Sequence, residues 1–191
     1  MKITADRDDA RRLAGLEPLR AAPQIDPGRV AAALDATAGG FRRPGPAMPG
    51  SAAPSPDGEG LARAVRAALD DAGPAPGDSG QANAHGTSTV LNDTAEAAAP
   101  HVVFRRPPPV TADKSVTGHP VGAAGASEAA PTVQTLRHGV VPPTANLDRT
   151  DGAIRLGVVT EVPRQVPGLR TAVSVSSGFG GRNAAVVLTA V

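Results

Sequence analysis

Apolar residues recur at helical spacing in the stretch that follows Asp57. Leu61, Val65 and Leu69 stand four positions apart, alanines lie beside them, and Gly73 closes the run. Residues three or four positions apart share one face of an α-helix, and glycine often ends one. The pattern therefore predicts an amphipathic helix that ends at Gly73.

Short strands and helices alternate through the middle of the chain. The expected elements are strands over residues 81–84 and 110–113 and helices over residues 92–98 and 120–138. Asn92 or Asp93 can cap the first of these helices, and Gly139 stops the second. Pro131 lies inside the second helix and should kink or split it, because proline has no N–H to donate and its ring obstructs the preceding turn.

Towards the C-terminus the pattern changes to that of β-strands. Apolar residues alternate over 154–158 and over 171–176, and residues 184–188 are continuously apolar, as in a strand covered on both faces. A glycine-rich turn, residues 177–183, joins the last two strands. Helices that alternate with strands and end in a hairpin predict a layered α/β domain with a mixed sheet.

The N-terminal part of the chain carries no chemistry that its sequence identifies. Short helical patterns over 6–16 and from residue 26 are followed, between Gly39 and Pro56, by glycine, proline, alanine and serine with few charges. The latter composition is typical of a linker. We leave residues 1–52 unassigned, as a disordered or loosely helical segment, and place one domain at residues 53–191.

Charge and hydropathy exclude several classes of function. The formal net charge is +1 with acids and bases interspersed, so the chain offers no basic surface for nucleic acid or an anionic membrane. No apolar run reaches the length of about 18 residues that a membrane span requires. The N-terminus mixes acids and bases instead of a basic cap and an apolar core, so it predicts no signal peptide. We therefore expect a cytoplasmic protein.

Cysteine is absent from all 191 residues. The chain therefore cannot form a disulfide, a thiolate metal site or a cysteine nucleophile of its own. Lys2 and Lys114 are the only lysines among 19 basic residues. Because arginine supplies nearly all the other positive charges, Lys114 stands out as a position where a plain positive charge would not suffice.

Polar residues cluster where strands end, over 83–89, 113–120 and 177–181, which is the usual place for a site in an open α/β sheet. His85 and His119 each sit next to a glycine, which lets a ligand approach the backbone closely. Two histidines that meet can donate hydrogen bonds to an oxygen that gains negative charge. The alternative is two loop histidines with structural hydrogen bonds. Metal binding is less favoured, since no carboxylate or cysteine lies at ligand spacing from either.

Residues 122–127 are all glycine, alanine or serine, and Glu128 follows them. Each glycine inside a helix costs about 1 kcal/mol relative to alanine, so close packing of a buried helix is the simplest compensation. A carboxylate on such a helix needs a cation, and Lys114 is the natural partner; the alternative is that Glu128 faces water. Phe179 lies in the glycine-rich turn, where its N–H could serve an oxyanion. Thr87 and Thr89 offer hydroxyls on one side of an extended segment.

Four segments, in this order, resemble one family: NAHGTST, DKSVTGHPVGAAGASE, PPTANLD and SSGFGGRNAAVVL, with PDGEGLARAVRAALDDAG upstream. They are similar to the β-ketoacyl-acyl carrier protein synthases, the decarboxylating condensing enzymes of fatty acid and polyketide synthesis. The resemblance covers roughly Ala53–Ala190, about the last third of a full synthase. It implies an α/β fold: the C-terminal half of a thiolase-like fold, layered αβα with a mixed sheet, and incomplete.

The resemblance also implies a reaction, a Claisen condensation. In this family an acyl group is loaded onto a cysteine, malonyl-carrier protein loses carbon dioxide, and the enolate attacks the acyl thioester. Carried over by position, His85 and His119 would assist decarboxylation and stabilise the enolate oxygen. Lys114 would order this site, and Glu128 would pair with the lysine.

The remaining roles follow from the same resemblance. Phe179 would be the gating residue whose N–H completes the oxyanion hole, and Thr87 and Thr89 would meet the phosphopantetheine arm. That arm belongs to the acyl carrier protein, so the chain needs no metal or prosthetic group of its own.

One departure from the family bears on activity: the nucleophilic cysteine lies in the family's N-terminal half, which is not present. We expect a truncated synthase that carries the histidine half of the site and is not competent alone. Its partners would be acyl carrier protein and a cysteine-bearing N-terminal half or ketosynthase subunit. The alternatives are a non-catalytic partner like a chain-length factor, which has no need of these histidines, and a degenerate remnant.

Overall fold

The computed structural model describes residues 54–190. The helical patterns over residues 6–16 and from residue 26, and nearly all of the predicted linker, lie outside the described residues. None of the described helices combines the length and the hydropathy of a membrane span.

The first described helix, α3 (Glu59–Ala72), is the predicted amphipathic helix. It buries Leu61, Val65 and Leu69 on one face. Gly73 follows in the left-handed conformation and donates its N–H to the Leu69 carbonyl. The sequence prediction for this element is confirmed, including its end at glycine.

A four-stranded mixed sheet forms the centre of the fold. Its strands are β1 (Ser79–Asn83), β2 (Val110–Thr111), β5 (Thr171–Gly178) and β6 (Arg182–Thr189). Their order is β2-β1-β5-β6, with parallel pairing except between β5 and β6. A separate small sheet joins β3 (Val140–Val141) to β4 (Arg164–Gln165).

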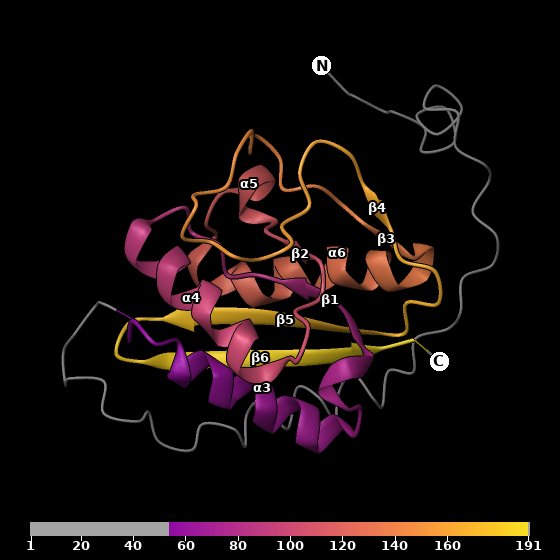
Figure 1. Cartoon of the computed structure of the whole chain (residues 1–191), viewed down its shortest axis with the longest axis horizontal. Coiled ribbons are helices and arrows are strands. Elements are labelled where there is room, and N and C mark those ends of the chain that lie inside the picture. Colours follow the sequence, from indigo (N-terminus) through magenta and orange to yellow (C-terminus); the bar gives the residue numbers. More distant parts are fainter. Residues whose placement is uncertain (1–53, 191) are drawn as a thin grey trace.

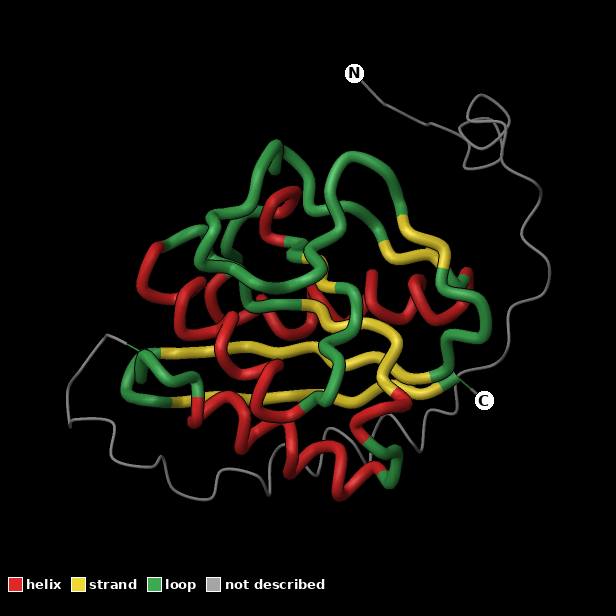
Figure 2. Tube along the Cα trace, in the orientation of Figure 1, coloured by secondary structure: helices red, strands yellow, loops and turns green. Residues whose placement is uncertain are grey.

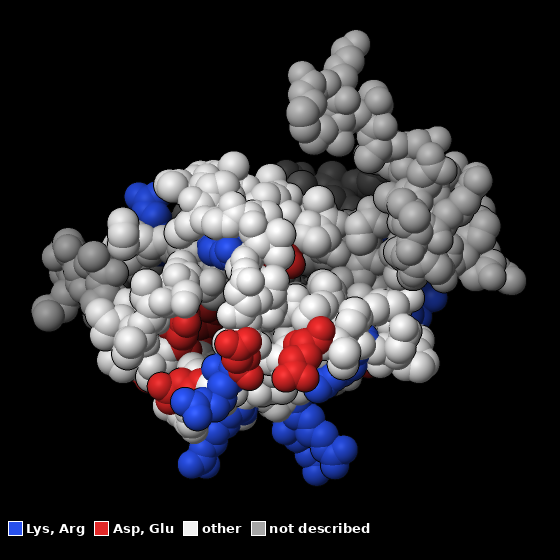
Figure 3. Space-filling model, turned by 90° about the horizontal axis from the view of Figure 1, so that it is seen from above, with Lys and Arg blue, Asp and Glu red and all other residues white. Residues whose placement is uncertain are grey.

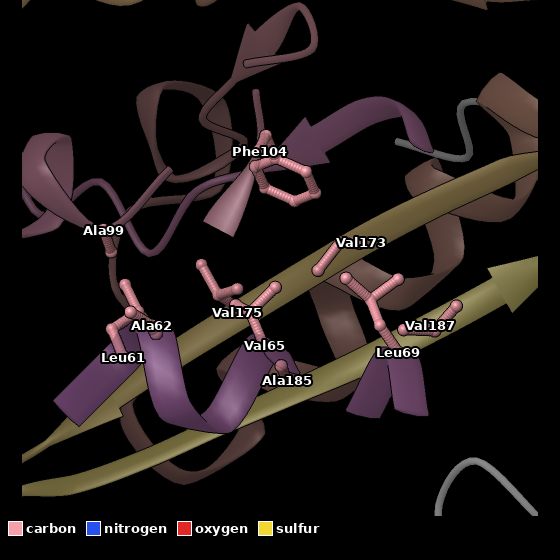
Figure 4. Close-up of a cluster of buried hydrophobic side chains, with 10 residues drawn as sticks. All are labelled: Leu61, Ala62, Val65, Leu69, Ala99, Phe104, Val173, Val175, Ala185 and Val187. Carbon is pink, nitrogen blue, oxygen red and sulfur yellow. The ribbon is translucent and has the colours of Figure 1, made fainter. Parts of the chain in front are cut away.

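Helices cover both faces of the sheet, so the predicted αβα layering is confirmed (Figure 1). Besides α3, the described helices are α4 (Val90–Val103), α5 (Lys114–Thr117) and α6 (Ala124–His138), with 3₁₀ turns η1 (Pro76–Asp78) and η2 (Val121–Ala123). α3 packs on one face through the core cluster that Figure 4 shows, and α6 packs on the other. β6 is buried from both sides: Val187 meets the α3 cluster and Leu188 the α6 cluster, as predicted for this continuously apolar strand.

The helix after β1 differs from its prediction at both ends. α4 begins at Val90, after Thr89, and extends to Val103. Asn92 and Asp93 therefore lie within the first turn and do not precede it. Asn92 instead donates to Glu96 one turn later, a contact that belongs to the site described below.

Pro131 does not split its helix, since α6 runs without interruption from Ala124 to His138. Thr132 and Leu136 are buried just after the proline, and Glu128 just before it. Packing on both sides of Pro131 holds the chain helical although one backbone hydrogen bond is lost. The prediction of a split was wrong.

Residues 154–158 form no strand, which corrects a second prediction. Only Val158 makes a β-bridge, to Val110, and the rest of this stretch is part of the long loops on one side of the sheet (Figure 2). β2 has just two residues, so it offers only a short edge with which residues 154–158 could pair. The alternating Ile154 and Leu156 instead line a cavity.

The small-residue stretch before Glu128 is not buried within the described structure. Gly122, Ala123, Gly125 and Ala126 are exposed, and only Ala124 and Glu128 of residues 122–128 are buried. The expected close packing is therefore absent among the described residues. In the view of Figure 3, acidic and basic groups adjoin one another beside wide uncharged areas, consistent with the small net charge.

Candidate functional site

The loop after β1 places His85 at the centre of the candidate site. The N–H groups of His85 and Gly86 donate to the two carboxylate oxygens of Glu96, at 2.6 and 2.8 Å. Gly86 has φ +46°, and a Cβ there would lie 2.6 Å from the Ala112 side chain. Glycine is thus required for the loop to pass so close to its neighbour.

Glu96 is a part of the site that the sequence analysis missed. It is buried in α4, and burial raises the pKa of its carboxyl while the backbone hydrogen bonds from Gly86 and His85 oppose that rise. The available signal was its position four residues after Asn92, since the two side chains hydrogen-bond across one helical turn. Glu96 fixes the backbone that carries His85.

Lys114 and Glu128 form a buried ion pair beside His85. The Lys114 and Glu128 side chains are 4% and 1% exposed, and the ammonium contacts the carboxylate directly. The second Glu128 oxygen accepts from the Ser176 hydroxyl at 3.2 Å. The predicted pairing is confirmed, and the alternative in which Glu128 faces water is wrong.

The two histidines lie side by side. The centroids of the His85 and His119 rings are 5.3 Å apart, and the rings meet edge to face at 84°. His85 is 5% exposed, whereas His119, which follows α5 and Gly118, is open to solvent. The expectation that the two loops bring these rings together is confirmed.

Hydrogen-bond partners assign the same tautomer to both rings. Lys114 Nζ lies 3.1 Å from His85 Nδ1, and an ammonium can only donate, so this nitrogen accepts. His119 Nδ1 accepts from the Val121 N–H at 3.2 Å. In each ring the proton therefore resides on Nε2, which leaves two N–H donors available to a third group.

Burial strongly favours the neutral form of His85. The pKa of His85 is lowered from 6.5 to about 4, mainly by burial and to a smaller extent by the charges of Lys114 and His119. Two effects disfavour a positive charge on a buried imidazole beside a lysine: the charge loses hydration, and the lysine repels it. His85 is consequently a neutral hydrogen-bond donor at neutral pH.

A second carboxylate, Asp113, borders the ion pair. The Asn83 side-chain amide donates to Asp113, to the Glu128 carbonyl at 3.1 Å and to Thr132 Oγ1 at 3.2 Å. Burial raises the pKa of Asp113, and the nearby Glu128 charge adds to the rise. Asn83 thereby ties the end of β1 to α6 behind the histidines.

A cavity of about 530 Å³ opens beside the site. The residues that line it near the histidines are Gly86, Thr87, Thr89, Lys114, Gly118 and His119. Thr87 Oγ1 and Thr89 Oγ1 lie 3.0 Å apart, and Val110, Ile154 and Leu156 form part of an apolar wall. The cavity thus combines a polar end at His119 and Lys114 with an apolar wall.

Phe179 stands apart from this cavity. It lies in the turn between β5 and β6, is 81% exposed and is not among the cavity's lining residues. The described residues bring His119, Lys114, Thr87 and Thr89 together at the cavity, with His85 next to His119 and Glu128 behind Lys114. The role expected of Phe179 stays a prediction.

Comparisons with known proteins agree with this architecture. Residues 47–148 match the family model described as "Beta-ketoacyl synthase, C-terminal domain". The chain belongs to the β-ketoacyl synthase family. Among curated relatives, the 3-oxoacyl-[acyl-carrier-protein] synthases 2 of Mycobacterium tuberculosis and Mycobacterium leprae are each 46% identical over 136 residues. The 136 aligned residues make up 70% of this chain but only 32% of each relative. This β-ketoacyl synthase domain therefore spans about a third of the length of those relatives.

Solved ketosynthases share the fold. The ishigamide ketosynthase/chain length factor superposes with a TM-score of 0.70 at 38% identity over 76% of this chain and 35% of that one. A type II polyketide ketosynthase in complex with its acyl-carrier protein gives 0.71 at 32% identity, over 76% and 36%. A ketosynthase in complex with its chain length factor from Xenorhabdus doucetiae gives 0.67 at 35% identity, over 76% and 36%. The fold is therefore that of part of a thiolase-like ketosynthase.

Proposed function

We propose that this β-ketoacyl synthase domain supplies the decarboxylating half of a condensing site. The observation that carries the proposal is the pair of Nε2–H groups on His85 and His119. Their Nδ1 atoms are occupied by Lys114 and by the Val121 N–H, and neither Nε2–H has a partner among residues 54–190, so both can donate to the same ligand oxygen. Two such donors that reach one oxygen would stabilise negative charge that develops there.

The reaction that suits these donors is loss of carbon dioxide from a malonyl thioester. The bond between the α-carbon and the carboxylate breaks, its electron pair forms the enolate, and the thioester oxygen gains the charge. The enolate carbon then attacks an acyl thioester, whose thiolate is the leaving group. The acyl-bearing thiol must come from outside these 191 residues, because they contain no cysteine.

Lys114 has a positioning role in this proposal. Its ammonium holds His85 Nδ1 as an acceptor, and Glu128 balances its charge behind the cavity. Thr87 and Thr89 at the cavity wall suit the polar phosphopantetheine arm of acyl carrier protein. Phe179 would act as the gating residue of the site when the partner polypeptide is bound. Substrates delivered on that arm need no metal or prosthetic group bound by this chain.

An exposed apolar surface around the site supports a cysteine-bearing partner. Val116 and Val121, on either side of His119 in the sequence, are 75% and 79% exposed, and the small-residue stretch 122–126 that follows Val121 is largely exposed as well. Apolar area of this kind marks an interaction surface. Related structures contain a ketosynthase with an acyl-carrier protein and with a chain length factor. The retained Lys114 and histidines argue against a purely non-catalytic partner.

The test uses the part of the Mycobacterium tuberculosis synthase outside the 136 matched residues, which by the family resemblance carries the cysteine. We expect the mixture to release carbon dioxide from malonyl-carrier protein and acyl label to appear on the added fragment alone. His119→Ala should abolish the release, whereas His138→Ala, at the exposed end of α6, should not. Acyl label on this chain, or equal loss in both variants, would refute the proposal.

A further inference from the structure

α5 is a single helical turn whose position depends on a few side chains. Within residues 54–190 it packs extensively against no other helix or strand. It stands above the ends of β1 and β2 (Figure 1). One turn of helix is not stable by itself. The position of His119, which follows α5 after Gly118, is therefore determined by the contacts that anchor this turn.

Ser115 anchors α5 on one side. Its hydroxyl accepts from the Ala145 N–H at 3.0 Å, and its carbonyl accepts from the Asn146 side chain at 3.2 Å. Ala145 and Asn146 belong neither to β1 nor to the loop after it. These contacts therefore leave open how far α5 lies from the loop that carries His85.

Two side-chain hydrogen bonds among the described residues join residues 113–117 to β1 and the His85 loop. Lys114 Nζ lies 3.1 Å from His85 Nδ1, and the Asn83 side-chain amide donates to the Asp113 carboxylate. The lysine carries its charge on a flexible four-carbon stem, so its ammonium can follow His85 when α5 shifts. Aspartate and asparagine are short, so the second contact fixes the separation of the two backbones.

Asn83 is itself held firmly. It is fully buried at the last position of β1. Its amide nitrogen also donates to the Glu128 carbonyl at 3.1 Å and to Thr132 Oγ1 at 3.2 Å, both on α6. The amide cannot rotate away without the loss of buried hydrogen bonds. Asp113 is thus attached to a point that β1 and α6 fix together.

The usual role of an aspartate before a helix does not explain Asp113. An N-cap aspartate accepts from an N–H of the first turn, but the Asp113 side chain makes no such bond, and its main-chain carbonyl accepts from the Thr117 N–H instead. Within residues 54–190 it forms no ion pair either, since Lys114 pairs with Glu128. A half-buried carboxylate whose side-chain partner is one amide points to a role in holding that amide.

We propose that Asp113 is a positioning residue for the histidine pair: its hydrogen bond with Asn83 sets the distance between the His85 loop and α5, and thereby the place of the second histidine. The inference rests on the proposed function, in which both Nε2–H groups donate to one oxygen. A charge-assisted hydrogen bond suits this role, since it is about twice as strong as a neutral one. Position matters because a displacement of about 1 Å can cost about 100-fold in rate.

Asp113→Leu and Asp113→Asn form a matched pair, similar in size, of which only asparagine keeps an acceptor for Asn83. NMR of the free chain gives the first readout. The His85 and His119 ring protons should show a nuclear Overhauser effect in the unchanged chain. Asp113→Leu should lose this effect while both rings keep the Nε2–H tautomer, because the partners of both Nδ1 atoms remain. Asp113→Asn should retain it.

Release of carbon dioxide gives the second readout, in the mixture with the Mycobacterium tuberculosis fragment that tests the proposed function. Asp113→Leu should lower kcat at least about tenfold and leave KM for malonyl-carrier protein within about twofold. Asp113→Asn should keep most of the rate. The control Asp70→Asn, at an exposed position of α3, should change neither constant.

Equal behaviour of the leucine and asparagine variants would overturn the proposal, as would a ring–ring effect that survives in Asp113→Leu. If the unchanged chain and the fragment release no carbon dioxide, the proposed function fails, while the NMR comparison still decides the role of Asp113. Circular dichroism checks the fold, and Asp113→Ala replaces Asp113→Leu if the latter does not fold. Loss of the fold in both would also overturn the proposal, because Asp113 would then be required for folding and not for position.

Discussion

Replacing Glu128 with glutamine leaves the Lys114 ammonium buried without a counter-ion. The two side chains are 4% and 1% exposed, so water cannot take over the lost interaction. Removing one partner of a buried pair typically costs about 3–5 kcal/mol. Glutamine keeps a carbonyl that can accept from Ser176 and from the lysine, so we expect a cost near the lower end, about 3 kcal/mol.

The double variant Lys114→Met/Glu128→Gln separates charge from shape. With both charges removed, no ion is left uncompensated, and the double variant should be more stable than Glu128→Gln alone. Loss of the lysine also removes the partner of His85 Nδ1, which costs about 1 kcal/mol. The expected coupling energy between the two positions is therefore about 2 kcal/mol or more.

Urea unfolding followed by circular dichroism measures these energies. The chain has no tryptophan or tyrosine, so intrinsic fluorescence is not an adequate probe. Linear extrapolation gives the free energy of unfolding for each variant. A cost below about 1 kcal/mol for Glu128→Gln, or strictly additive single changes, would refute a desolvated ion pair at this position.

Three further predictions concern the same region. Glu96→Gln weakens the hydrogen bonds from the His85 and Gly86 N–H groups. Hydrogen exchange of these two amides should therefore become about tenfold faster or more. The control Glu59→Gln, on the surface, should change neither rate. For His85 the folded pKa of about 4 lies below the unfolded value of 6.5, so its contribution is complete above pH 6.5 and is lost as pH falls towards 4. His85→Gln should remove that slope, at most about 1.4 kcal/mol per pH unit, and an unchanged slope in urea titrations would contradict the lowered pKa. Gln81→Leu removes a buried amide oxygen for which the described residues supply no hydrogen-bond partner. The change should raise the free energy of unfolding in urea by about 1–3 kcal/mol, and a lower value would show that the amide is satisfied.

Local patterns predicted the parts of the fold in which neighbouring residues decide the outcome. α3 and the β5–β6 hairpin were recognised because periodicity and glycine punctuation are short-range properties. The Lys114–Glu128 pair was predicted by a physical requirement, since a buried carboxylate needs a cation. These inferences did not depend on the rest of the molecule.

The sequence was insufficient where tertiary neighbours decide. Apolar residues alternate over 154–158 in the same way whether the segment is a strand or a loop that lines a cavity. The outcome depends on β2, which is too short to serve as a pairing partner over this whole stretch. Pro131 was expected to kink or split its helix, and the split is absent because packing on both sides holds the helix together. Glu96 was missed because an acid among alanines in a short helix has the pattern of a surface residue, although its carboxylate faces the backbone of His85.

Nitrogen NMR of the histidine side chains tests the central claim most directly. The claim is that His85 and His119 both present Nε2–H donors to one oxygen, with their Nδ1 atoms occupied. At pH 7 we predict the Nε2–H tautomer for both rings, and His85 should stay neutral when the pH is lowered to 5.5. An Nδ1–H tautomer in either ring, or a positively charged His85 at pH 5.5, would contradict the account.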